Sequence, residues 1–244
     1  MIRRVATWLV ALVVLSAGAH FVMQAYRPQP TNDLTPTGLA PPSEVSRPPA
    51  QPTRSSVDRP QVDQAWVTRT ARRAGVPEPA VLAYARAMLM SPKACQVGWT
   101  TLAGIGWVES QHGTIGGRTL GADGHSSSPI LGPALDGGRF AAIPATARST
   151  AWHGDPDWDH AVGQMQFIPS TWEQWGADGD GDGAADPNDI DDAAYAAARY
   201  LCADGRDLAS SSGWSGGIFS YNHSDEYVAD VHAAATAYAE RSTR

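Results

Sequence analysis

The sequence predicts a mainly α (α+β) domain that follows an export segment and a proline-rich linker. Apolar residues recur at helical spacing through most of residues 61–244, and no alternating pattern is strong enough for a large sheet. The excess of proline is confined to one stretch near the start of the chain. With 244 residues, 43% hydrophobic content and nine tryptophans, the chain can bury one sizeable core, which excludes a wholly disordered protein.

The charge balance excludes some classes of partner. Eighteen basic residues stand against 25 acidic ones, for a net charge of −7 and a pI near 5.4. A protein that neutralises the phosphates of DNA or RNA needs the opposite balance, so nucleic acid is not an expected partner. A monomer is expected.

The first 26 residues have the pattern of an export signal. Arg3 and Arg4 precede an apolar run that ends near Met23. We therefore expect an exported protein of the cell envelope. The small residues at 17–19 offer a cleavage site, whereas the apolar run is just long enough to span a bilayer, so secretion and anchoring to the cytoplasmic membrane remain alternatives.

Residues 27–60 are predicted to be a disordered linker. They contain nine of the 18 prolines and almost no aliphatic side chains, so they bury too little apolar surface to offset their ordering entropy. The folded domain is then 61–244, which has 12 basic and 22 acidic residues. Seven of these acids lie within 178–192. This local acidity requires a local reason.

The chain has two cysteines, Cys95 and Cys202. In an exported protein such a pair favours a disulfide over two buried thiols. No further soft ligands lie at close spacing, so a structural zinc site is not expected.

Periodic apolar residues predict seven helices. Residues 113–158 are rich in glycine, serine, proline and aspartate, which predicts long loops with at most a short hairpin. The predicted helices span residues 61–74, 77–90, 100–109, 170–175, 191–203, 216–221 and 225–240.

Glu109 is the first candidate for chemistry. It lies on the same helical stripe as Leu102 and Ile105, at the point where the helix opens into a polar loop that contains Gly113. Partial burial there disfavours the charged carboxylate and raises its pKa. A glutamate with a raised pKa can serve as a general acid near neutral pH, although an ordinary helix-terminal glutamate is the alternative.

Three motifs resemble those of a known enzyme family. They are VESQHG at 108–113, GQMQFIPSTW at 163–172 and SYNHSDEYV at 220–228. In this order, with the intervening segments 121–137 and 141–146, they are similar to the lytic murein transglycosylases of the membrane-bound B type, and most of all to the actinobacterial relatives. The resemblance covers most of the folded domain and implies a lysozyme-like fold.

The resemblance also implies an activity. These enzymes cleave the β-1,4 bond between N-acetylmuramic acid and N-acetylglucosamine in peptidoglycan with one catalytic glutamate, which Glu109 matches. The acid protonates the glycosidic oxygen, then acts as a base on the C6 hydroxyl of the muramic sugar, and a 1,6-anhydro ring forms. Ordinary glycosidases need a second carboxylate across the bond, and the sequence offers no obvious partner.

The resemblance further implies the residues that contact the glycan. Aromatic faces stack on sugars, while amides and phenols hydrogen-bond to their polar groups. We expect Ser170 to cap a helix that begins at Thr171. His112, His153, His160 and His223 lack the spacing of zinc ligands and are interpreted as loop or groove residues. The substrate-binding candidates are Gln166 with the flanking Met165 and Phe167, the pair Tyr221 and Asn222, and Tyr227. Apart from the resemblance, core packing is the alternative for Tyr221 and Tyr227.

The acidic segment 178–192 resembles a calcium loop. Its carboxylates at alternating positions, followed by Gly183, reproduce the first half of an EF-hand loop. Asp189 stands where that loop has its glutamate, but the transglycosylase relatives use a longer loop whose last aspartate matches Asp192. An acidic loop without metal, or one that holds sodium or magnesium, is the alternative to structural calcium. The predicted ligands are Asp178, Asp180, Asp182, the backbone oxygen of Ala184, and Asp192.

Two other functions compete with a transglycosylase. A hydrolytic muramidase would add water at the cleaved bond, and Asp155, Asp157 or Asp159 could direct that water. A catalytically silent wall-binding module would hold glycan in the same groove, with the calcium loop as a stiffener. A Glu109→Gln variant separates a catalyst from a binding module.

Overall fold

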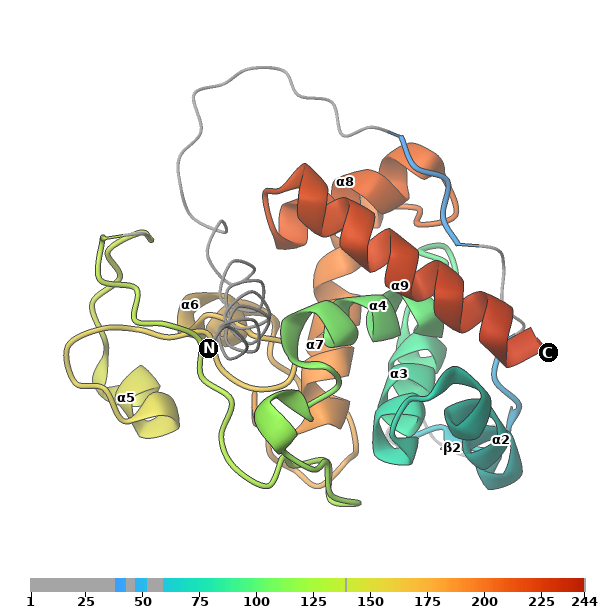
Figure 1. Ribbon diagram of the computed structural model, residues 1–244, viewed down its shortest axis with the longest axis horizontal. Helices are drawn as coiled ribbons and strands as arrows, with labels where there is room; N and C mark the ends of the chain where they lie inside the picture. Colours follow the sequence, from blue (N-terminus) through green and yellow to red (C-terminus); the bar gives the residue numbers. More distant parts are fainter. Residues whose placement is uncertain (1–37, 43–46, 52–58, 139, 244) are drawn as a thin grey trace, which may run out of the picture.

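The computed structural model describes residues 38–42, 47–51, 59–138 and 140–243. These residues form a mainly helical domain (Figure 1), as predicted. The predicted export segment 1–26 lies outside the described residues, as does most of the predicted linker 27–60. Within the described ranges, no helix combines the length and the hydropathy that crossing a membrane requires.

The described part of the chain contains eight α-helices and two short 3₁₀ helices. The 3₁₀ helices are η2 (Ile115–Gly117) and η3 (Ala203–Gly205). The α-helices are α2 (Gln64–Ala74), α3 (Glu78–Met90), α4 (Trp99–Ser110), α5 (Ala147–His153), α6 (Pro169–Trp175), α7 (Ile190–Leu201), α8 (Ser211–Tyr221) and α9 (Asp225–Thr243).

Helix α4 lies at the centre of the core and packs on α9 and α3, while α3 also packs on α7 (Figure 1). Every residue of α4 except Trp107 and Val108 is buried. Two glycines permit this close packing. A Cβ atom at Gly104 would lie 2.7 Å from the carbonyl oxygen of Val231 on α9, and one at Gly106 would overlap the hydroxyl of Tyr84 on α3. The position of α4 is therefore determined by its neighbours on several sides.

The described pieces of the 27–60 segment lie against the domain. Strand β1 (Ala50–Gln51) pairs antiparallel with β2 (Gln61–Val62), just before α2. Leu39 packs against the hydrophobic core, and its carbonyl oxygen accepts a hydrogen bond from Ser215 Oγ at 3.2 Å. These contacts add a short sheet and a covering segment to the helical domain.

Two predicted helices begin elsewhere because of their caps. Helix α2 begins three residues later than expected, since Asp63 Oδ1 accepts the backbone N–H of Trp66 at 2.6 Å. Helix α8 begins at Ser211 instead of residue 216, because Ser210 Oγ accepts the backbone N–H of Gly213 at 3.1 Å. The first residue of each of these helices is therefore set by its cap residue, and the apolar spacing alone did not predict it.

The prediction that Ser170 caps a helix is wrong. Helix α6 begins at Pro169, and Ile168 occupies the N-cap position without a side-chain hydrogen bond. Proline suits the first helical position because its fixed φ matches the helix and its missing N–H has no partner to lose. Ser170 consequently lies inside the first turn of α6.

Helix α5 lies in the segment that the sequence predicted as loops. A capping box forms it: Thr146 Oγ1 accepts the backbone N–H of Ser149 at 3.0 Å, and Ser149 Oγ accepts that of Thr146 at 2.9 Å. The other order in this segment consists of isolated β-bridges, such as the one between Leu120 and Ser126. Seven residues with little apolar periodicity gave no helical signal.

Cys95 and Cys202 form a disulfide, as predicted. The bond joins the loop before α4 to the residue that follows α7. Closing a loop of this length can contribute up to about 4 kcal/mol of stability through the entropy of the unfolded chain. The disulfide therefore ties together two of the helices that form the core.

Candidate active site

Glu109 lies in the last turn of α4 and is buried, with 8% of its surface exposed. Its Oε1 accepts a hydrogen bond from the hydroxyl of Tyr227 on α9 at 2.6 Å. Burial raises the pKa of Glu109 to about 8, while the hydrogen bond from Tyr227 acts in the opposite direction. The carboxyl group therefore carries a proton at neutral pH, as a general acid must.

The turn after Glu109 is tightly constrained. Gln111, His112 and Gly113 all have positive φ angles, of 53°, 60° and 83°. Ser110 Oγ donates to the carbonyl oxygen of Gln164 at 2.6 Å and accepts the backbone N–H of Gly113 at 2.8 Å. The end of α4 is thus fastened to the segment that carries the motif at 163–172.

A pocket of about 140 Å³ lies beside this segment. Gln166, whose own backbone has a positive φ of 50°, lines this pocket. Its Nε2 donates to the carbonyl oxygen of Gly163 at 2.8 Å. The lining combines aromatic rings, one amide and hydroxyl groups, which suits a sugar. The lining residues are Gln166, Phe167, Ile168, Thr171, Tyr200, Ser220, Tyr221 and His223.

Tyr221 connects this pocket to Glu109. Its hydroxyl donates to the carbonyl oxygen of Met165 at 2.8 Å, and its ring stacks on that of Tyr227, with centroids 6.4 Å apart. Burial, followed by the nearby Glu109 carboxyl, raises the pKa of both tyrosines well above the usual value. Both phenols therefore remain neutral hydrogen-bond donors at neutral pH.

The predicted substrate residues divide between the pocket and the core. Gln166, Phe167 and Tyr221 line the pocket. Met165 is fully buried, and its carbonyl oxygen rather than its side chain serves the site by holding Tyr221. Asn222 and Tyr227 are also buried, with 4% and 1% of their surfaces exposed. Tyr227 touches the carboxyl of Glu109 from inside the core.

Sequence reasoning missed some of the pocket. Tyr200 comes from α7, and its ring packs edge-on against that of Tyr221, with centroids 5.6 Å apart. Thr171 lies on α6 and belongs to the motif at 163–172, but it was not among the predicted substrate-binding residues. No local signal marked Tyr200, because only the packing of α7 against α8 brings it to the pocket.

The interpretation of His112 and His153 as loop or groove residues is wrong for their side chains. His112 is 1% exposed and lies between the hydroxyls of Tyr84 and Tyr238, at 3.0 and 2.8 Å. Burial lowers its pKa to about 3. The side chain of His153 is fully buried against Asp159, at 3.2 Å. Both rings lie inside the protein, where buried polar side chains satisfy their hydrogen bonds.

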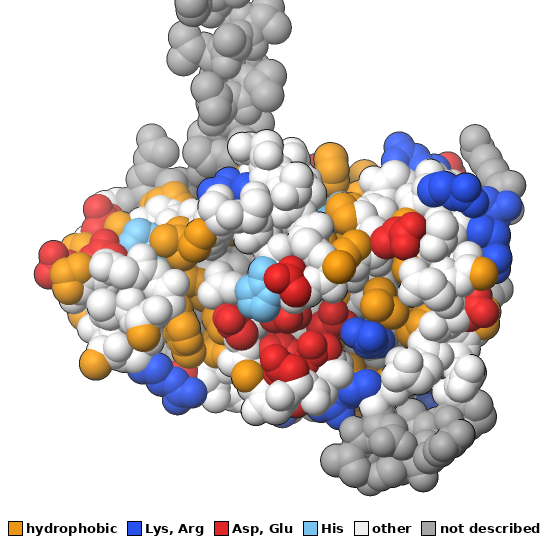
Figure 2. Space-filling view, turned by 90° about the horizontal axis from the view of Figure 1, so that it is seen from below, with side chains coloured by type: hydrophobic (Ala, Val, Ile, Leu, Met, Phe, Trp, Pro, Cys, Tyr) orange, Lys and Arg blue, Asp and Glu red, His pale blue; other side chains and the backbone are white. Residues whose placement is uncertain are grey.

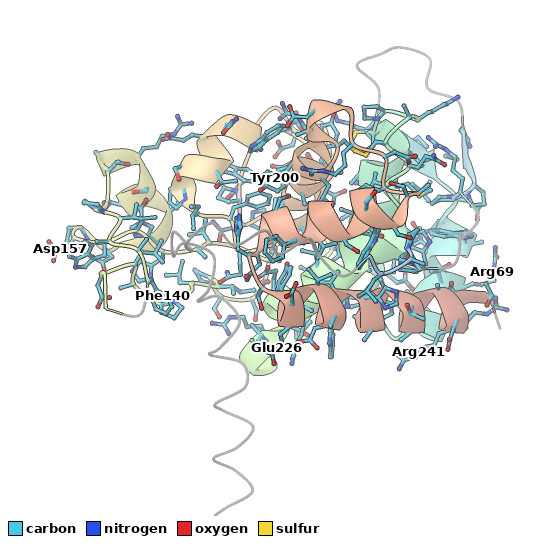
Figure 3. The ribbon with its side chains drawn as sticks, turned by 90° about the horizontal axis from the view of Figure 1, so that it is seen from above. Arg69, Phe140, Asp157, Tyr200, Glu226 and Arg241 are labelled. Carbon is cyan, nitrogen blue, oxygen red and sulfur yellow. A yellow bond between two sulfur atoms is a disulfide. The ribbon has the colours of Figure 1, made fainter. Side chains whose placement is uncertain are left out.

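The three aspartates considered for a muramidase lie in the lobe that contains α5. Asp155 Oδ2 lies 3.1 Å from His160 Nε2, and this hydrogen bond is the main reason that its pKa falls to about 2. Asp159 is buried and accepts a hydrogen bond from Ser149 Oγ. Asp157 lies at the end of the molecule opposite Arg69 (Figure 3). Asp155 and Asp159 thus hold this lobe together.

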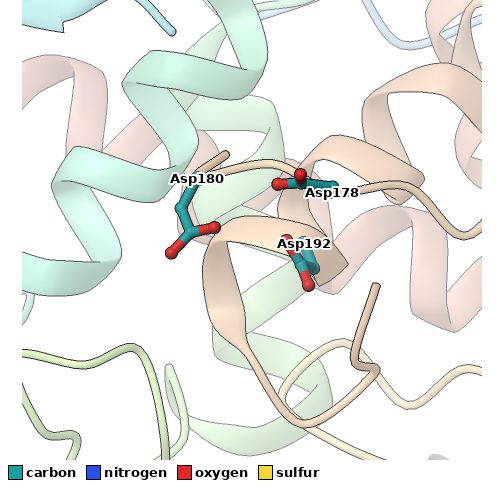
Figure 4. Close-up of side chains that lie close together, drawn as sticks. All are labelled: Asp178, Asp180 and Asp192. Atoms are coloured by element: carbon teal, nitrogen blue, oxygen red, sulfur yellow. The ribbon is translucent and has the colours of Figure 1, made fainter. Parts of the chain in front are cut away.

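Three of the predicted metal ligands converge. Asp178, Asp180 and Asp192 place carboxylate oxygens within 4.8 Å of one another (Figure 4). Asp192, in the first turn of α7, accepts the backbone N–H groups of Gly179 at 2.6 Å and Asp186 at 2.8 Å. These hydrogen bonds fold the loop around the carboxylate of Asp192.

The other acids of this loop have different roles. Asp182 is exposed, lies outside the group of three, and accepts the backbone N–H of Ala184 at 2.7 Å. Asp189 caps α7 by accepting the N–H of Asp191 at 2.7 Å, and it lies 3.7 Å from His125. Figure 2 shows the resulting concentration of carboxylates on one face of the molecule, with a histidine beside them.

A helical domain in which a buried carboxyl with a raised pKa is linked through Tyr227 and Tyr221 to an aromatic pocket has the features of an acid catalyst that acts on glycans. Residues 145–214 match the family model described as Transglycosylase SLT domain. The match supports a peptidoglycan lytic transglycosylase within the lysozyme-like superfamily. Comparison with curated proteins and with solved structures gave no match.

The matched region covers well under half of the chain. It includes Gln166 and the acidic loop 178–192. Glu109, Tyr221 and Tyr227 lie outside it, so their roles depend on the geometry described above. The match and the geometry are therefore two separate lines of support.

Proposed function

We propose that this protein is a lytic transglycosylase of the membrane-bound B type that cleaves the β-1,4 bond between N-acetylmuramic acid and N-acetylglucosamine in peptidoglycan. The observation that carries this proposal is Glu109, a buried carboxyl whose pKa is raised to about 8 and which accepts a hydrogen bond from Tyr227. The match at 145–214 supports the class of enzyme and its substrate.

Glu109 acts first as an acid. Tyr227 donates to Oε1, so the proton of the neutral carboxyl is carried by Oε2. Oε2 delivers this proton to the glycosidic oxygen while the bond from that oxygen to C1 of the muramic sugar breaks. The N-acetylglucosamine side leaves as an alcohol, and the Glu109 carboxylate remains.

The same carboxylate then acts as a base. It accepts the proton of the C6 hydroxyl of the muramic sugar, and the C6 oxygen attacks C1 to close a 1,6-anhydro ring. Glu109 thereby regains its proton, and no water is consumed. The hydrogen bond from Tyr227 stabilises the carboxylate between the two steps, because it is stronger toward a charged acceptor.

The pocket lined by Gln166 and Tyr221 binds the glycan strand in this proposal. Tyr221 and Phe167 offer aromatic surface, and Gln166 offers its amide oxygen, since its Nε2 is already bonded to Gly163. Asn222 follows Tyr221 at the end of α8.

Calcium is proposed as a structural ion of the loop 178–192. The observed convergence of Asp178, Asp180 and Asp192 fits a hard cation, which oxygen ligands prefer. Bound there, the ion would neutralise the clustered carboxylates. Asp182 and the carbonyl oxygen of Ala184, the other two predicted ligands, fit less well, because Asp182 holds the N–H of Ala184.

Export to the cell envelope is part of the same proposal. Its support is the basic and apolar pattern of residues 1–26 together with a substrate that lies outside the cytoplasm. The protein works as a monomer, either free in the wall space or held at the membrane by that segment.

The test is mass analysis of the fragments released when the protein digests purified peptidoglycan. Products one water lighter than those of a muramidase establish the anhydro-forming reaction. Glu109→Gln should lower the rate at least about 10³-fold and leave binding to peptidoglycan intact, because the amide keeps the shape but carries no transferable proton. The exposed Glu240→Gln is the matched control and should keep full activity.

Other results would contradict the proposal. Products that contain the extra water would make the protein a hydrolytic muramidase. Binding without any release of fragments would make it a wall-binding module. Full activity of Glu109→Gln would remove the catalytic assignment of that residue.

A further inference from the structure

A buried hydrogen-bonded chain joins three helices behind Glu109. His112, three residues after Glu109, places Nδ1 3.0 Å from the hydroxyl of Tyr84 on α3 and Nε2 2.8 Å from the hydroxyl of Tyr238 on α9. Its backbone N–H donates to the carbonyl oxygen of Gly106 on α4 at 2.8 Å. The reaction proposed above uses none of these side chains.

The direction of this chain follows from burial. Tyr84 is fully buried, so its hydroxyl proton needs an acceptor within the protein, and Nδ1 of the neutral His112 ring is in place for it. The ring proton is then on Nε2 and is donated to the oxygen of Tyr238, which is 5% exposed. His112 thus satisfies both phenols at once, which no aliphatic side chain could do.

Tyr238 and Tyr227 lie on the same face of α9. They are eleven residues apart, which is about three helical turns, and both point toward α4. Tyr227 bonds to Glu109, and Tyr238 bonds to His112. Helix α9 is therefore fastened to the end of α4 at two points, one at the reacting carboxyl and one just beyond it.

We propose that His112 is a positioning residue that, through Tyr84 and Tyr238, holds α4 and α9 in the alignment that brings the Tyr227 hydroxyl to the Glu109 carboxyl. The inference rests on the proposed function for its effect on the reaction. Gly104 and Gly106 support it, because they let α9 and α3 approach α4 closely, and His112 lies within hydrogen-bond distance of a tyrosine from each of these two helices. A displacement of about 1 Å in catalytic geometry can cost as much as 10²-fold in rate.

The experiment uses Tyr238→Phe, which removes one hydroxyl and leaves the ring packing intact. Tyr84→Phe is the second variant, and His112→Gln the more severe one. The matched control is Thr101→Val, which removes another buried hydrogen bond of α4, from Trp214 Nε1 to Thr101 Oγ1 at 3.1 Å, far from Glu109 along the helix. Cleavage of peptidoglycan is followed below the melting temperature of every variant.

We expect Tyr238→Phe to lower kcat about tenfold with KM unchanged, and Thr101→Val to leave both constants unchanged. In a Tyr227→Phe background, Tyr238→Phe should have no further effect on kcat, because the contact through which it acts is already absent. The proposal would be overturned if Tyr238→Phe lost as much stability as Thr101→Val and kept a normal kcat.

A measurement of unfolding separates this inference from the proposed function. If the unaltered protein releases no anhydro products, the proposed function fails, but the alignment can still be tested. Tyr227→Phe and Tyr238→Phe should then be non-additive, by at least about fivefold in the unfolding equilibrium constant, although the two sites are about three helical turns apart. Additive effects would overturn the role of His112 in either case.

Discussion

The environment of Glu109 and the loop 178–192 differ in how many carboxyl groups they bring together. Glu109 is a single acid within a buried aromatic group, and one phenol is its hydrogen-bond partner. The loop gathers seven acids in fifteen positions, and backbone N–H groups hold several of them close together. The first region surrounds one carboxyl with phenols, whereas the second brings many carboxyls close to one another.

This difference shows what each region can do. Burial without a countercharge keeps Glu109 neutral, so it can give up a proton during a reaction. Convergence of Asp178, Asp180 and Asp192 instead creates repulsion that a bound cation would relieve. We therefore propose acid catalysis for the first arrangement and metal binding for the second.

The largest effect on stability is expected from Glu109→Gln. The folded protein keeps Glu109 protonated up to about pH 8, while the unfolded chain ionises it near pH 4.5. Stability from this group is thus fully present below pH 4.5 and is lost as the pH rises through 8. We expect the variant to match the unaltered protein at pH 4 and to exceed its unfolding free energy by up to about 5 kcal/mol at pH 9.

Urea unfolding at a series of pH values measures this difference. Glu240→Gln is again the control, because that side chain is exposed on α9. If the difference in unfolding free energy between Glu109→Gln and the unaltered protein stays constant from pH 4 to 9, burial does not keep Glu109 protonated.

Calcium tests the other half of the comparison. At a concentration about 100 times the dissociation constant, it should add about 2.7 kcal/mol to the unfolding free energy. For a domain of this size, that corresponds to a rise of about 5–10 °C in the melting temperature. The measurement is a thermal scan after chelation and again after calcium is restored.

Two variants make the calcium test specific. Asp192→Asn should abolish the rise, because Asp192 belongs to the group of three carboxylates. Asp182→Asn should retain most of it, since this side chain lies outside the group. An unchanged melting temperature of the unaltered protein after chelation and restoration would remove the metal from the proposal.

The smallest effect is expected from Tyr227→Phe. The hydrogen bond from Tyr227 lowers the pKa of Glu109, so its loss should raise that pKa further. The alkaline limb of kcat/KM should move up by about one pH unit, which corresponds to roughly 1.4 kcal/mol. Tyr195→Phe, a half-buried tyrosine of α7, should leave the limb in place. A limb that moves down instead would contradict the role of this hydrogen bond.

Local patterns predicted most of the fold. Apolar periodicity placed seven of the eight described α-helices, and it failed for α5, where a capping box formed by Thr146 and Ser149 replaces an apolar stripe. Glu109 was found because it continues the buried stripe of α4 into a polar turn. Tyr200 and the buried network of His112 were not found, because neither produces a pattern in the residues next to it in the sequence.

By itself, the sequence determined the helical class, the disulfide between Cys95 and Cys202, and the candidacy of Glu109, because spacing, composition and residue chemistry are local properties. Only the tertiary structure decided which groups surround Glu109, which carboxylates converge and which histidines are buried. These depend on contacts between helices far apart in the chain, such as α4 with α9. Desolvation and hydrogen bonding arise at such contacts, and they decide whether a carboxyl holds its proton.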